Sequence, residues 1–110
     1  TRSAFVTGVQ TCALPISALN DAMAVGVLAT LRSRGVSVPD DVSVIGFDDM
    51  PIAQDVVPPL TTIRLGMPEM GERAMSLALS PPALEPRIEH LPAELIIRSS
   101  TAPPGRTETG

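Results

Sequence analysis

The chain has 110 residues, which is enough for one domain with a modest core. Its formal net charge of -4 and its two aromatic residues, Phe5 and Phe47, argue against direct binding to a nucleic-acid backbone or stacking on bases. No apolar run is long enough for a membrane span, and a single cysteine, Cys12, excludes a disulfide framework.

The first sixteen residues have an unusual pattern. Residues 6–16, VTGVQTCALPI, resemble the in-frame translation of a widely used sequencing-library adapter, and Thr1 and Arg2 fit the upstream arm of that adapter. The alternative is an ordinary β-strand that leads into a helix. We expect residues 1–16 to be an adapter-derived artefact. Because the chain begins with Thr rather than Met, we also expect it to be a fragment of a longer protein.

A helix is predicted to begin after Asn20, since Asn is a strong N-cap residue and the Asp that follows it suits the helix dipole. Apolar residues then recur at helical spacing and form one stripe, made of Ala24, Val27, Leu28 and Leu31. Gly35 is predicted to end this helix.

A buried strand is predicted over residues 42–47, after a turn at residues 39–41. Its short, β-branched, apolar run is typical of a strand covered on both faces. Two carboxylates, Asp48 and Asp49, follow at its C-terminal end. In an open α/β sheet, ligands bind at that end of the strands.

The rest of the chain alternates between strand and helix. We expect a loop over residues 48–59, a strand over residues 60–64, a helix from Pro68 to the prolines at 81 and 82, and a last strand over residues 91–98. The second helix has an apolar stripe formed by Met67, Met70, Ala74, Leu77 and Ala78. The pattern indicates an α/β domain over residues 17–103, followed by a disordered tail over residues 104–110.

Three motifs occur in a specific order: NDAMAVG at residues 20–26, VPDDVSVIGFDD at residues 38–49, and PPLTT at residues 58–62. Together with LPAELIIRSST at residues 91–101, they resemble the C-terminal part of the effector-binding region of LacI/GalR-type bacterial transcription regulators. The resemblance implies part of a periplasmic-binding-protein-like (type I) fold, mainly its C-terminal subdomain, with a mostly parallel sheet and flanking helices.

The resemblance also implies a function. Such a chain would sense a small-molecule effector, often a sugar, and would dimerise within a cytoplasmic regulator that acts as a repressor. Operator DNA would be bound only through an N-terminal domain that this chain lacks. The alternative is a fragment of a periplasmic sugar-binding protein of an ABC-type transporter. An enzyme is disfavoured, because no nucleophile–base pair, metal cluster or phosphate loop accompanies the two aspartates.

By resemblance, Asp48, Asn20 and Phe47 are the candidate effector-binding residues. Each has a structural alternative: a turn for Asp48, the helix N-cap for Asn20, and core packing for Phe47. Asp49 is expected to be structural, in an Asx-turn. Leu65 departs from the family pattern, because many sugar-responsive members have Gln there and Leu cannot form hydrogen bonds.

Dimer contacts are implied at Val25, Asp55 and Val56. An apolar Val25 on a helix whose core stripe lies elsewhere fits a dimer face, although a single apolar surface residue is also common. His90 stands alone in a polar connection without partner ligands, so we expect no metal site and no cofactor.

Overall fold

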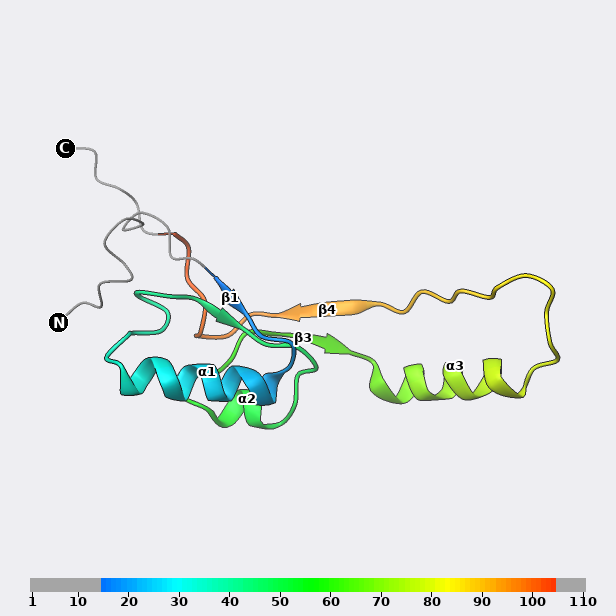
Figure 1. Cartoon of the computed structure of the whole chain (residues 1–110), viewed down its shortest axis with the longest axis horizontal. Coiled ribbons are helices and arrows are strands. Elements are labelled where there is room, and N and C mark those ends of the chain that lie inside the picture. Colours follow the sequence, from blue (N-terminus) through cyan, green and yellow to red (C-terminus); the bar gives the residue numbers. More distant parts are fainter. Residues whose placement is uncertain (1–14, 105–110) are drawn as a thin grey trace.

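The computed structural model describes residues 15–104 (Figure 1). The predictions for residues 1–14 and 105–110 therefore lie outside the described residues. The elements follow one another as β1 (Ile16–Ser17), α1 (Asp21–Ser33), β2 (Val44–Ile45), α2 (Ile52–Asp55), β3 (Thr62–Leu65), α3 (Met67–Leu79) and β4 (Ala93–Ile96).

The strands described within residues 15–104 form two two-stranded sheets, β1–β2 and β3–β4. β1 pairs in parallel with β2, and Ile16 is opposite Val44. A parallel bridge between Ile45 and Thr61 joins β2 to the segment that leads into β3. β3 then pairs with β4 in the antiparallel sense, from Thr62↔Ile96 to Leu65↔Ala93. The predicted α/β class with a mostly parallel arrangement is confirmed, with β4 as an antiparallel addition.

The first helix forms where its end signals predict it. The Asn20 side chain caps α1 by accepting a hydrogen bond of 2.8 Å from the Met23 amide. At the other end Gly35 has a φ of 71°, and the Gly35 and Val36 amides donate to the Arg32 and Leu31 carbonyls. This pair of bonds is the Schellman ending, which requires a left-handed residue and explains the glycine.

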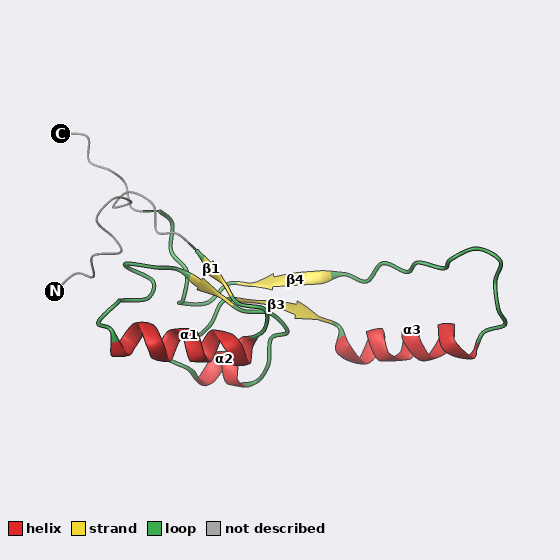
Figure 2. Cartoon of the chain, viewed as in Figure 1, coloured by secondary structure: helices red, strands yellow, loops and turns green. Residues whose placement is uncertain are grey.

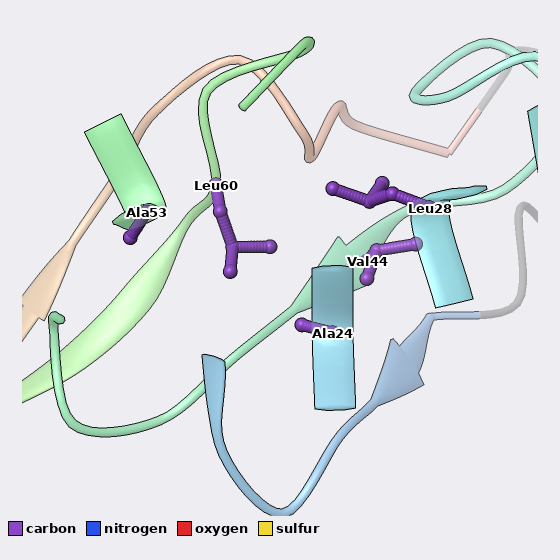
Figure 3. Packing of buried hydrophobic residues seen from close by; sticks show 5 residues of the cluster. All are labelled: Ala24, Leu28, Val44, Ala53 and Leu60. Carbon is purple, nitrogen blue, oxygen red and sulfur yellow. The ribbon is translucent and has the colours of Figure 1, made fainter. Parts of the chain in front are cut away.

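The core lies between the strands and the two helices α1 and α2 (Figures 1 and 2). Figure 3 shows the buried apolar side chains of this core within residues 15–104, which are Ala24, Leu28, Val44, Ala53 and Leu60. The predicted stripe of α1 is confirmed, because Ala24 and Leu28 are buried and Val27 and Leu31 pack against them.

Two expectations about the strands and loops were wrong. The strand predicted over residues 42–47 was expected to be buried on both faces. Val44 is buried, but Ile45 and Phe47 are only half-buried. One helical turn, α2, occurs in the predicted loop. The turn has no helical pattern in the sequence, and the burial of Ala53 against Leu60 stabilises it.

The first strand begins inside the segment that we expect to be adapter-derived. β1 starts at Ile16, the last residue of that segment, and Ile16 packs against the core at the edge of the sheet. An apolar side chain of any origin would fit this position. The adapter origin of residues 1–16 stays a prediction.

Helix α3 projects beyond the end of β3, away from α1 and α2 (Figure 1). It forms as predicted over Met67–Leu79, with Pro68 in its first turn, but none of its residues is buried. Of the predicted stripe, Met67, Ala74 and Ala78 are exposed, and Met70 and Leu77 are half-buried. The stripe is therefore present in the sequence, but none of its residues is buried within residues 15–104. No helix in this part of the chain is both long and apolar enough to cross a membrane.

Candidate functional site

A buried aspartate connects the start of α1 to the strand ends. The side chain of Asp21 is fully buried and accepts hydrogen bonds of 2.6 Å from the Thr62 hydroxyl and 2.6 Å from the Met50 amide. The Asp21 amide donates to the Phe47 carbonyl at 2.9 Å. Gly46 leaves room for this carboxylate, because a Cβ there would lie 2.1 Å from Asp21 Oδ1. The start of α1, the 46–50 segment and β3 are thus held together around one side chain.

The three predicted effector-binding residues come together at this point. Asn20 immediately precedes Asp21, and Phe47 and Asp48 lie at the other end of the Asp21–Phe47 hydrogen bond. All three side chains are half-buried. Asn20 caps α1 through Oδ1, as its structural alternative predicts, which leaves its NH2 group as a donor. The Asp48 carboxylate forms no ion pair within residues 15–104.

Asp49 faces two arginines. Its Oδ1 lies 2.7 Å from Arg98 Nη2, and its Oδ2 lies 2.7 Å from Arg64 Nε. Burial raises the pKa of Asp49, but the hydrogen bonds and charges of Arg98 and Arg64 outweigh it and lower the pKa below the ordinary 3.8. The prediction of a structural role is confirmed. The expected Asx-turn is wrong, because the residue two positions further on is Pro51, which has no N–H to donate to the carboxylate.

The predicted dimer residues also lie together. Val25, Asp55 and Val56 line one groove of about 290 Å³ between α1 and the α2 segment. The other lining residues are Leu28, Ala29, Arg32 and Val57. Arg32 donates to the Val57 carbonyl and so ties α1 to the segment that follows α2. Five of the groove's seven lining residues are apolar, and the other two, Arg32 and Asp55, are charged.

Sequence reasoning missed Asp21, Arg64 and Arg98 as parts of the site. The sequence indicates Asp21 only as a favourable charge in the first turn of a helix, although it is the residue on which the site is built. No local signal identifies Arg98, because its partner Asp49 lies 49 residues earlier in the chain.

The chemistry of these groups is that of binding. Carboxylate and amide groups accept and donate hydrogen bonds to polar molecules. Within residues 15–104, no three His, Cys, Asp or Glu side chains lie close enough to hold a metal ion. Polar groups at the carboxyl ends of parallel strands, next to a helix start, define the class of open α/β domains that bind ligands at that edge.

Comparison with known proteins agrees with this class. Residues 6–101 match the family described as periplasmic binding protein-like domain. The chain is 42% identical over 87 residues to the transcriptional regulator MalR of Streptomyces coelicolor, covering 76% of this chain and 25% of that protein. It is 37% identical over 91 residues to a lactose operon repressor from Rhizobium radiobacter, covering 81% of this chain and 80% of that sequence.

Comparison with a solved structure also indicates a LacI-type regulator. A LacI family regulator from Enterococcus faecium with bound ribose superimposes with a TM-score of 0.69 at 36% identity, over 81% of this chain and 34% of that one. The chain belongs to the periplasmic binding protein-like domain family, as part of the effector-binding region of a LacI-type transcription regulator. It spans about a quarter of the length of MalR.

Proposed function

We propose that this chain forms one wall of an effector cleft in a LacI-type regulator, and that Asp48 is its main polar contact with the effector. One observation carries the proposal: Asn20, which follows β1, lies beside Phe47 and Asp48, which follow β2. The buried Asp21 holds these two strand ends together. A carboxylate can accept hydrogen bonds from two hydroxyl groups, and the NH2 group of Asn20 can donate one.

The proposed effector is a carbohydrate or a related polar metabolite. The regulator from Enterococcus faecium carries ribose, which supports a small polyhydroxylated ligand. Leu65 at the end of β3 is half-buried and cannot form hydrogen bonds. We therefore expect the effector to place an apolar edge, rather than a hydroxyl group, at that position.

The proposed role is regulation rather than transport or catalysis. The relatives described above are transcription regulators and a repressor, which favours this interpretation over a solute-binding protein of an ABC-type transporter. Both carboxylate oxygens of Asp49 are held by arginines, and no group of three His, Cys, Asp or Glu side chains within residues 15–104 could hold a metal ion. We place the protein in the cytoplasm, where it would bind operator DNA through a separate N-terminal domain.

The groove lined by Val25, Asp55 and Val56 is proposed as the dimer face of the full-length regulator. Its lining combines five apolar residues with Arg32 and Asp55, and this composition supports a subunit contact. The remainder of the longer protein is proposed to cover the exposed stripe of α3.

The test of the effector site uses the full-length regulator that carries this sequence. Ribose, sucrose and cellobiose are titrated by calorimetry, and the ligand that binds is then titrated into Asp48→Asn. Loss of a hydrogen bond to a charged group is expected to weaken binding by about tenfold or more. Asp40→Asn, in the exposed turn before β2, is the matched control and should bind like the wild type. Unchanged affinity in Asp48→Asn would overturn the proposal.

A further inference from the structure

Two consecutive aspartates adopt a backbone conformation that residues with a Cβ rarely adopt. Asp48 has a φ of 98° and Asp49 a φ of 53°. Among residues 15–104 they are the only non-glycine residues with positive φ. The left-handed region crowds Cβ against the backbone, so that such residues persist only where their surroundings hold them.

The backbone of this segment is held from two sides. The Asp48 amide donates to the Ile63 carbonyl at 2.9 Å, and the Met50 amide donates to Asp21 Oδ2 at 2.6 Å. The Asp49 amide makes a longer contact of 3.4 Å to the Thr62 hydroxyl. Each partner belongs to β3 or to the start of α1, so three successive amides point into the domain.

The ion pairs of the Asp49 side chain also hold the backbone of this segment. It is 5% exposed, and Arg98, its main partner, is only 14% exposed. Arg98 also donates to the Leu60 carbonyl at 2.9 Å, which fixes the guanidinium itself. Arg64 is 49% exposed and also forms an ion pair with Glu94, with 3.5 Å between Arg64 Nη1 and Glu94 Oε2. The Arg98 pair is therefore less screened by solvent than the Arg64 pair.

We propose that Arg98, and to a lesser degree Arg64, are positioning residues that act through Asp49 to hold Asp48 in its left-handed conformation and so direct the Asp48 carboxylate to the effector. The contact between the Asp48 carboxylate and the effector rests on the proposed function. The arginines do not touch the effector in this scheme. Their role is to make the backbone at Asp48 rigid before the effector arrives, which reduces the ordering cost of binding.

The test measures the Asp48 backbone directly by NMR in this chain. Arg98→Met is expected to shift the φ-sensitive coupling and the Cα and Cβ signals of Asp48 away from left-handed values. It should also speed amide exchange at Asp48 and Met50 by about tenfold or more. Arg73→Met is the matched control, because Arg73 is exposed on α3 and its nearest carboxylates lie 3.9 and 4.0 Å away. It should leave the Asp48 signals unchanged.

Two milder variants keep the test decisive if Arg98→Met does not fold. Arg98→Lys keeps the charge but cannot reach Asp49 and the Leu60 carbonyl with the same fork, and Arg64→Met removes the more exposed partner. A shift at Asp48 in any folded variant, with none in Arg73→Met, supports the proposal. Wild-type signals at Asp48 in all the folded variants would overturn it.

The failure of this proposal can be told apart from the failure of the effector role of Asp48. The NMR measurement needs no effector, so it judges the arginines alone. In the full-length regulator, weakened effector binding in Asp48→Asn with unchanged binding in Arg98→Met would keep the effector role and reject the positioning role. Unchanged binding in Asp48→Asn would reject the effector role whatever the NMR result.

Discussion

Gly46 shows how one missing side chain makes room for the site. A Cβ at this position would lie 2.1 Å from Asp21 Oδ1 and 2.8 Å from Leu60 Cδ2. Both groups are buried, so neither can move into solvent. The Gly46→Ala substitution is expected to lower the free energy of unfolding by about 2–3 kcal/mol, in the upper part of the range for overpacking. Urea denaturation followed by circular dichroism measures this change.

Gly26 provides the control for that experiment. It lies within α1 and is exposed, and a Cβ added there would meet no other atom within 4 Å. Gly26→Ala should therefore raise stability by about 0.5–1 kcal/mol, since Ala favours a helix interior over Gly. Equal effects of the two substitutions would show that the Asp21 carboxylate is not packed against Gly46.

The Asp49 carboxylate makes stability depend on pH in acid. Its pKa is lowered in the folded state, so its contribution is present above the ordinary value of 3.8 and is lost as the pH falls through the lower folded pKa. The urea midpoint of the wild type should decline below about pH 4, and the decline should be shallower in Asp49→Asn, which has no charge to lose there. Parallel curves for the two proteins would contradict the ion pairs with Arg98 and Arg64.

At the scale of elements, local signals decided what the sequence could predict. α1 was predictable because its cap, its stripe and its terminal Gly35 are all local. α2 and β1 are too short to carry a periodic pattern, and tertiary packing decides them. The position of Asp48 followed from the strand before it. The partners of Asp49 did not, because Arg64 and Arg98 lie 15 and 49 residues further along the chain.

Helix α3 is the element with the least support. It has 13 residues, none of them buried, and a helix of this length is marginal in water without tertiary contacts. In hydrogen exchange followed by NMR, we expect α3 amides to be protected less than about tenfold and those of α1 by about a thousandfold. Ala24 and Leu28 anchor α1, whereas the stripe of α3 has nothing to anchor it within residues 15–104. Equal protection of both helices would show that the stripe is covered.

At the scale of the whole molecule, the groove between α1 and α2 is the proposed dimer face. Val25→Arg places a long charged side chain in the groove shared with Asp55 and Val56, and should shift the full-length regulator from dimer to monomer in sedimentation velocity. Thr30→Arg is the control, because Thr30 is exposed on α1 and does not line the groove. A dimer that persists in Val25→Arg would place the subunit contact elsewhere.

The proposed effector site limits the ligand affinity that we expect for this chain alone. The proposed dimer groove is lined by residues of α1 and of the α2 segment, whereas the proposed effector site has only the wall formed by Asn20, Phe47 and Asp48. A pocket gains its affinity by burying most of the ligand surface, and a single wall leaves one side of the ligand in water. Two polar contacts, from Asn20 and Asp48, and one aromatic contact, from Phe47, leave little net affinity without that burial after the cost of association. We therefore expect calorimetry of this chain with ribose to give no measurable binding, and Asp48→Asn to be indistinguishable from the wild type. Micromolar binding by the chain alone would show that the second wall is not required, and that the site at Asp48 is more enclosed than its half-buried side chains indicate.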